Sequence, residues 1–407
     1  MNDLSPPSGE TSNDFLRDAT SILVLSLAPA IGLGMARFAY ALVLPSMRSD
    51  LGWSYTEAGW LNASNAAGYL LGALFCARTV TKSGAFRVMV LGVWACVGAL
   101  LLCALTEQTI LLNAARGIAG LGGGFAFVAG GVLAARIAQN NPAQGAFLLG
   151  LFYAGPGLGI FLSGVTVPFV LEFSSEYGWK IAWAILAGQA LVLALTIAWR
   201  ASRYAPQGAA PSLDQQRRTG RPRMPLLLGG YFLFGAGYIA YMTFMIAWVQ
   251  SDGGAAGIQA LFWAVIGTAA MASPWIWSGL LRSLRNGHAF AVLTAVTAVG
   301  AVLPLVWGSL DALLVSASLF GVAFFAVVAS TTAFVRRNLP PADWASAIGA
   351  LTVSFSLGQM IGPVLVGAVN DRTQGLSGGL WVSALLLVVA AVVGGLQRDS
   401  SDHIHGT

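Results

Sequence analysis

The chain has 407 residues, of which 57% are hydrophobic and 9% are charged, and its formal net charge is +5. A soluble globular protein carries about 25% charged residues, so this composition excludes a soluble domain and predicts an all-α membrane protein with many spans. The basic excess falls between apolar runs and therefore does not indicate nucleic-acid binding.

Twelve apolar runs of about 20 residues follow one another, each long enough to cross a bilayer as a helix. Their approximate limits are 19–45, 56–77, 87–105, 108–135, 144–171, 179–199, 225–249, 256–280, 289–308, 310–335, 345–369 and 377–396. The cysteines Cys76, Cys96 and Cys103 all lie in such runs and are interpreted as small core residues. No metal site and no cofactor is predicted.

One long polar stretch divides the runs into two sets of six. Residues 200–223 hold six arginines and little that could pack, and we interpret them as a cytoplasmic linker. The predicted organisation is a tail at 1–18, a six-helix bundle at 19–199, the linker at 200–223, a second bundle at 224–397 and a tail at 398–407. The first 18 residues lack the basic start and short apolar core of a signal peptide.

The basic residues predict the orientation in the membrane. The segments on the side of the N-terminus hold 16 of the 21 Lys and Arg residues, whereas the opposite side holds three. Positive charge accumulates on the cytoplasmic side of membrane proteins, so both termini and the linker are predicted to be cytoplasmic. The last two basic residues, Arg37 and Arg116, lie inside apolar runs, and no Asp or Glu lies in the middle of a run.

The two sets of six runs are related by an internal repeat. At an offset of 203 residues Gly32 and Gly34 fall on Gly235 and Gly237, and at an offset of 199 residues Gly159 falls on Gly358. A parallel repeat of six plus six helices, with a substrate site near the midplane between the halves, is typical of major facilitator transporters.

Short motifs make this resemblance specific. Arg116 with Gly120 resembles the arginine–glycine motif of the superfamily's fourth helix, and Gly362-Pro363 resembles its glycine–proline motif. The segment 72–84, which leads from the second run to the third, has Cys76 where the superfamily usually carries an aspartate. The stretches 34–40 and 235–241 resemble the YbfB/YjiJ-type branch. The residues to which the resemblance assigns gating or structural roles are Gly72, Arg78, Gly84, Gly120, Gly155, Pro156, Gly362 and Pro363.

Arg37 and Arg116 are the leading candidates for a binding site, because a charge inside a span is expensive and indicates function. They are predicted about 10 Å and 12 Å below the outer ends of their helices, at a rise of 1.5 Å per residue. Two arginines at one depth without an acidic partner favour an anion between them, bound through paired hydrogen bonds. The alternative is that Arg116 bonds backbone carbonyls or Glu107 and couples helix movements.

Further candidates come from both halves. Asn62, Asn65 and Tyr69 share one face of the second helix, and the asparagines could bind substrate or hold helices together. Tyr40 and Tyr153 are weaker candidates in the first half. The second half offers Tyr238, Tyr241 and Gln359.

The sequence therefore predicts a monomeric, multi-pass transporter of the bacterial inner membrane that moves a small organic anion, in particular a carboxylate, by alternating access. The coupled partner is a proton or a counter-anion. The alternative is an efflux pump of the same superfamily for apolar or cationic compounds. An enzyme is not predicted, since no nucleophile–base pair or metal cluster is apparent.

Overall fold

A computed structural model describes residues 8–174, 177–200, 224–284 and 286–398. The described chain is almost entirely helical, as the composition predicts. The predicted linker beyond Arg200 and the last nine residues lie outside the described residues. The predicted tail 1–18 is described from Ser8, where the first helix begins.

The helices follow one another with short connections. In chain order they are α1 (Ser8–Pro29), η1 (Ala30–Phe38), α2 (Tyr40–Leu51), α3 (Tyr55–Ser83), α4 (Ala85–Leu105), α5 (Thr109–Ala138), α6 (Gly145–Tyr153), α7 (Gly155–Gly164), α8 (Val167–Phe173), α9 (Gly178–Arg200), α10 (Pro225–Ser251), α11 (Ala256–Ile276), α12 (Ser278–Ser283), α13 (His288–Val306), α14 (Leu310–Asn338), η3 (Pro341–Asp343), α15 (Trp344–Thr373) and α16 (Ser377–Gly395).

Eleven helical segments in the described residues are long and apolar enough to cross a membrane. The twelfth predicted span is α3, which is 29 residues long but more polar, because it carries Asn62 and Asn65. All twelve predicted runs are helical. Prolines near the starts of α7 and α8 divide the fifth span into three pieces.

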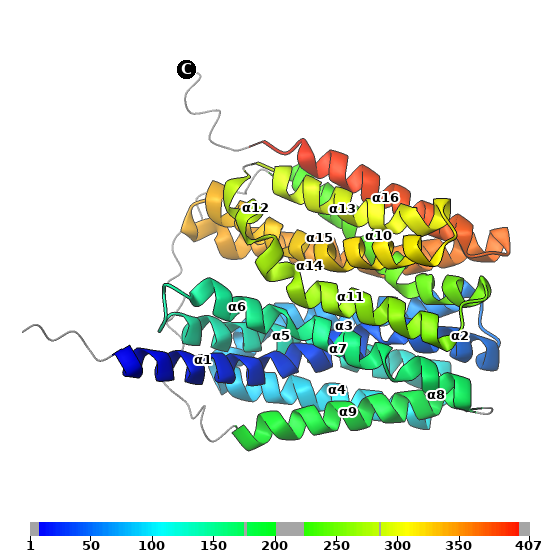
Figure 1. The fold of residues 1–407 in the computed structure, drawn as a ribbon, viewed down its shortest axis with the longest axis horizontal. Coiled ribbons are helices and arrows are strands. Elements are labelled where there is room, and N and C mark those ends of the chain that lie inside the picture. The colour runs from blue at the N-terminus through cyan, green and yellow to red at the C-terminus, as the bar shows by residue number, and fades with distance from the viewer. Residues whose placement is uncertain (1–7, 175–176, 201–223, 285, 399–407) are drawn as a thin grey trace, which may run out of the picture.

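The helices form two groups that lie side by side (Figure 1). We call α1–α9 the N-terminal group and α10–α16 the C-terminal group. The groups meet where α15 packs along α3, α11 along α7 and α10 against α2. We call the end of the molecule where α1 begins, and where Arg78, Lys82 and Arg337 lie, the basic face, and the other end the opposite face.

The first span differs from its prediction. It continues without a break from α1 through η1 and α2 to Leu51, although the sequence indicated an end near residue 45. Arg37 therefore lies 14 residues, or about 21 Å, from the end of this span, not about 10 Å. The part around Arg37 is η1, a π-helix of nine residues that the sequence did not predict.

Glycines bring the helices of each group into backbone contact. A Cβ atom at Gly120 of α5 would lie 2.0 Å from the carbonyl oxygen of Asn65 in α3, and one at Gly34 would lie 2.4 Å from Cα of Gly159 in α7. In the C-terminal group, a Cβ at Gly362 would lie 2.2 Å from the carbonyl oxygen of Ala236. Small residues at such crossings allow membrane helices to pack closely.

We expect Gly120→Ala to destabilise the protein, because the new methyl group meets a backbone oxygen that moves only if α3 and α5 separate. Overpacking of this kind costs about 1–3 kcal/mol or more. Thermal unfolding in detergent should show a lower midpoint. The control is Gly98→Ala in α4, where a Cβ meets nothing within 4 Å; equal midpoints for the two variants would contradict the packing argument.

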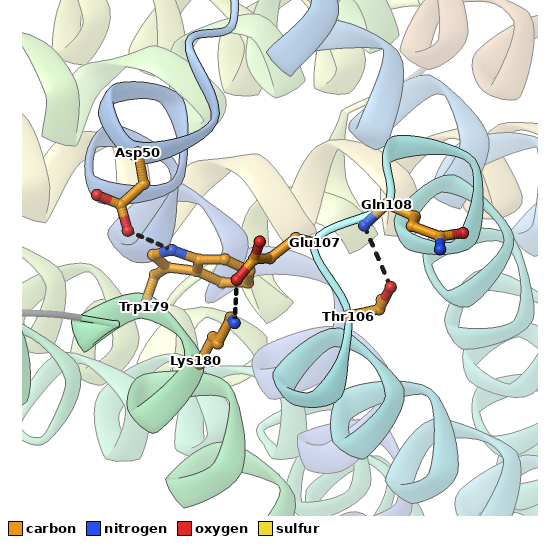
Figure 2. A network of polar contacts seen from close by, with 6 residues as sticks. All are labelled: Asp50, Thr106, Glu107, Gln108, Trp179 and Lys180. Carbon is orange, nitrogen blue, oxygen red and sulfur yellow. Dashed lines mark hydrogen bonds and ion pairs between the residues drawn. The ribbon is translucent and has the colours of Figure 1, made fainter.

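Polar contacts tie the N-terminal group together at the opposite face (Figure 2). Trp179 at the start of α9 donates from Nε1 to Asp50 at the end of α2, at 2.8 Å, and Lys180 forms an ion pair with Glu107. Exposed ion pairs of this type contribute little to stability. The pair does show that the partner of Glu107 is Lys180 and not Arg116.

Candidate functional site

Arg37 lies between the two helix groups, near the middle of the molecule. Its side chain extends from η1 and is only 4% exposed. Its Nη2 donates a hydrogen bond of 2.7 Å to Oε1 of Gln359 in α15, and its guanidinium lies 5.1 Å from the ring centroid of Tyr69 in α3. Tyr69 and Gln359 occupy the middle of their helices, so the contact is at the mid-height of the bundle.

Gln359 extends this contact into the C-terminal group. Its Nε2 donates to the hydroxyl oxygen of Tyr238, which lies at the middle of α10. The result is a chain of polar groups from Arg37 through Gln359 to Tyr238 across the interface. In the described residues, no Asp or Glu forms an ion pair with Arg37, and its Nε has no hydrogen-bond partner.

Arg116 lies behind Arg37, inside the N-terminal group. Its Nη1 donates to the carbonyl oxygen of Ala36, and its Nη2 donates to the carbonyl oxygen of Arg37 at 3.1 Å and to Oδ1 of Asn62 at 3.3 Å. The guanidinium also lies 4.8 Å from the ring centroid of Tyr40. These contacts correspond to the carbonyl alternative for Arg116.

The π-helix explains why carbonyl oxygens are available to Arg116. At the end of η1 the amide of Ala39 bonds to the carbonyl of Gly34, five residues back, and the amide of Leu42 bonds to Ala39, three residues back. The regular helical pattern is thus interrupted beside Ala36 and Arg37. Arg116 donates to the carbonyl oxygens of these two residues, at the place where the helical pattern changes.

The two asparagines of α3 have different positions. Asn62 reaches the interface, where its Nδ2 donates to Oγ1 of Thr243 in α10 while its Oδ1 accepts from Arg116. Asn65 faces α5 and donates to the carbonyl oxygen of Arg116 at 3.0 Å. Asn65 therefore joins two helices of the same group, although its Oδ1 has no partner.

Three candidate tyrosines lie away from Arg37 and Gln359. Tyr40 is fully buried, and its hydroxyl donates to the carbonyl oxygen of Ala58 at 2.8 Å. Tyr241 points into the C-terminal group, where its hydroxyl bonds to Ser316 and its ring stacks on Phe320. Tyr153 is 45% exposed. The structure therefore brings together Arg37, Asn62, Arg116, Tyr238 and Gln359. Tyr40 and Asn65 contact Arg116 from within the N-terminal group.

Residues 29–394 match the sequence profile of the family described as uncharacterised MFS-type transporter YbfB. The chain belongs to this family of major facilitator transporters. It is therefore a multi-pass membrane transporter and not an enzyme.

Individual relatives of the transporter have low sequence identity to it. It is 26% identical over 393 residues to a chloramphenicol resistance protein of Streptomyces lividans, covering 91% of this chain and 94% of the relative. It is 23% identical over 344 residues to a cis,cis-muconate transport protein of Acinetobacter baylyi, covering 80% and 81%. A solved structure of a bacterial homologue of the human lysosomal transporter Spinster has a TM-score of 0.67 at 16% identity, covering 93% and 96%, and shares the fold.

Most of the residues that match the superfamily motifs lie where helices pack against each other or where the chain turns. Gly72 lies against the backbone of Leu121, Gly155 against Ser26, and Arg78 is exposed near the end of α3. Gly84 has φ +84°, a conformation that favours glycine, and forms the tight turn into α4. Pro156 lies in the first turn of α7, and Pro363 lies where a Cβ on Gly59 would meet its carbonyl oxygen. A gating role for these residues stays a prediction.

Asp371 is an interface residue without a distinguishing pattern in the sequence. It lies near the end of α15, and its carboxylate accepts hydrogen bonds from the backbone amides of Tyr55 and Thr56, at 2.8 and 3.0 Å, and from the Thr56 hydroxyl. Amides in the first turn of a helix have no partner within the helix and carry partial positive charge. Asp371 therefore joins the C-terminal group to the start of α3 at the opposite face.

Among the other interface residues, Tyr69 carries a signal in the sequence, whereas Thr243, Phe38 and Asp371 do not. Tyr69 shares a helix face with Asn62, so the same spacing that selected the asparagines also selects it. Thr243 and Phe38 had no signal, because a threonine and a phenylalanine are ordinary inside a membrane helix. An aspartate at the end of a span is equally ordinary, which is why Asp371 was missed.

Proposed function

We propose that the transporter moves a small organic anion, a carboxylate in particular, and that Arg37 binds its negative group. The observation that carries the proposal is a buried guanidinium at mid-height between the groups whose partner is a neutral amide, Gln359. A carboxylate offers an arginine two parallel hydrogen bonds and a compensating charge, which an amide oxygen does not. The relation to a cis,cis-muconate transport protein supports this class, because muconate is a dicarboxylate.

In this proposal the neighbouring residues have separate roles. Arg116 holds the backbone of η1 and so positions Arg37. Gln359 turns from Arg37, and Tyr238 turns from Gln359, to the incoming carboxylate. Asn62 and Thr243 connect the groups beside the site. Residues 19–199 and 224–397 are the two bodies that rock about this site.

The proposal includes an orientation in the membrane, a conformation and an oligomeric state. Because positive charge accumulates on the cytoplasmic side of membrane proteins, we propose that the basic face and both termini are on the cytoplasmic side of a bacterial inner membrane. The hydrogen bonds at Arg37, Asn62 and Asp371 join the groups from mid-height to the opposite face, which supports a conformation closed to the outside. We propose a monomer in which a proton or a counter-anion accompanies the substrate.

A second candidate is export of apolar or cationic compounds. It is favoured by the relation to a chloramphenicol resistance protein. Against cation binding, no acidic side chain contacts Arg37 in the described residues, and the site itself carries positive charge.

A ligand screen on the purified protein tests the two candidates. Thermal unfolding is measured with small carboxylates, amines and dyes as sodium or chloride salts, with sodium chloride at equal ionic strength as control. We expect carboxylates to raise the unfolding temperature, because a ligand that binds only the folded state stabilises it. Stabilisation by cations or neutral drugs alone would overturn the carboxylate proposal in favour of export.

A further inference from the structure

Aromatic rings surround the Arg37–Gln359 contact on both sides of the interface. In the C-terminal group, Tyr238 carries the hydroxyl that bonds to Gln359, and its ring is nearly parallel to those of Phe234 and Phe355, with interplanar angles of 12° and 6°. Phe324 lies 6.0 Å from the same ring at 24°. Gln359, which accepts the hydrogen bond from Arg37, therefore also bonds to a tyrosine whose ring lies in a stack of nearly parallel rings.

The N-terminal group contributes rings of its own. Phe38, which follows Arg37 in the chain, lies 5.8 Å from the guanidinium, and its ring meets Phe324 edge-on at 6.0 Å and 89°. Tyr69 lies 5.1 Å from the guanidinium on another side. The rings of the two groups therefore meet beside the Arg37 guanidinium.

The polar groups in this region are few. Gln359 and Tyr238 bond to each other, and the Thr243 hydroxyl is engaged by Asn62. A sugar or other polyol would bring several hydroxyls that need partners, and each buried hydroxyl without one is costly. An amine would need an acidic partner, and no carboxylate contacts Arg37 in the described part of the chain.

Resting on the proposed function, we propose that the transported carboxylate has a flat, unsaturated body, aromatic or conjugated, which binds between Phe38 and Tyr69 on one side and Tyr238 and Phe324 on the other. Ring faces and edges bind flat π-systems in offset-stacked or edge-to-face arrangements, and these add to the gain from apolar burial. A puckered saturated body of similar size gains free energy from apolar burial but cannot form these stacked or edge-to-face contacts.

Two matched ligand pairs test the proposal on the full-length wild-type protein. Benzoate is compared with cyclohexanecarboxylate, and cis,cis-muconate with adipate, by calorimetric titration at neutral pH, where all four acids are ionised. Each pair keeps the carboxylates and the number of carbons and differs in unsaturation. We expect the unsaturated member of at least one pair to bind about tenfold more tightly.

Ring variants locate the preference. Phe38→Leu and Phe324→Leu should each reduce the ratio within that pair toward one, and binding of both acids of the pair is measured for each variant. Phe169→Leu is the control, because Phe169 lies in α8 with 39% of its side chain exposed, away from Arg37. An unfolding scan of each variant checks the fold, and the wild-type ratio remains decisive if a variant is unstable.

The outcomes separate the two proposals. Equal binding within both pairs overturns the flat-body inference and leaves the carboxylate proposal intact. Binding of none of the four acids overturns both. A ratio that persists unchanged in both ring variants, with the fold retained, overturns the assignment of the rings.

Discussion

Replacing Arg37 by lysine is expected to reduce uptake of a carboxylate substrate at least tenfold. Lysine keeps the positive charge but lacks the planar fork that forms two parallel hydrogen bonds, and a hydrogen bond to a charged group is worth about 1.5–3 kcal/mol. The shorter reach of one amine also loses the 2.7 Å contact to Gln359. Arg37→Gln, which removes the charge, should reduce uptake further.

The measurement is uptake of a radiolabelled carboxylate found in the ligand screen, into vesicles with purified protein. The control is Arg87→Lys, because Arg87 is exposed at the basic face and lies outside the interface. If Arg37→Lys took up the carboxylate as fast as the wild type, the proposal that Arg37 binds the carboxylate would be contradicted. Loss of uptake with normal unfolding temperature separates binding from folding.

Replacing Asp371 by alanine is expected to open the opposite face. The carboxylate accepts two backbone amides and one hydroxyl from the other helix group, and losing even one such bond, at about 1.5 kcal/mol, shifts a two-state equilibrium about tenfold. The capping box of Ser54 and Glu57 remains, so α3 should keep its start. The variant should therefore change the distance between the two helix groups and leave the helix content unchanged.

Spin labels on the two groups can measure this shift. Gln108 precedes α5 and Gly308 precedes α14, so cysteines at these positions report the separation of the groups at the opposite face. The native cysteines, which are buried, would be replaced by alanine. A longer-distance population should appear in Asp371→Ala and not in Asp311→Ala, a change of an exposed aspartate on the same face. Identical distributions for wild type and Asp371→Ala would contradict a closing role.

The number and order of the helices could be predicted from the sequence because burial in a bilayer demands long apolar runs. The first span shows where this fails. Apolar content falls beyond residue 45, yet the helix continues to Leu51, because Pro45 is tolerated there and the polar end reaches the surface. The π-helix at 30–38 could not be predicted, since no residue pattern in the run marks it, and its contact with Arg116 comes from another helix.

The site could be predicted in part. Arg37 and Gln359 were selected from opposite halves, and the structure brings them into contact. Tyr238 and Tyr241 are three residues apart on one helix, and only the rotation of α10 against its neighbours decides that Tyr238 reaches Gln359 while Tyr241 reaches Ser316. Helical spacing leaves this rotation open, because it is set by side-chain packing between distant parts of the chain.

The repeat pairs Arg37 with Ala240, so the charge at the interface has no counterpart in the other half. An empty transporter then holds the positive charges of Arg37 and Arg116 in the membrane, and binding of a monocarboxylate lowers this charge by one unit. A unit charge that crosses the whole membrane field changes energy by about 2.3 kcal/mol per 100 mV. Under the proposed function, the membrane potential therefore acts more strongly on the reorientation of the empty carrier than on that of the carrier loaded with a monocarboxylate alone.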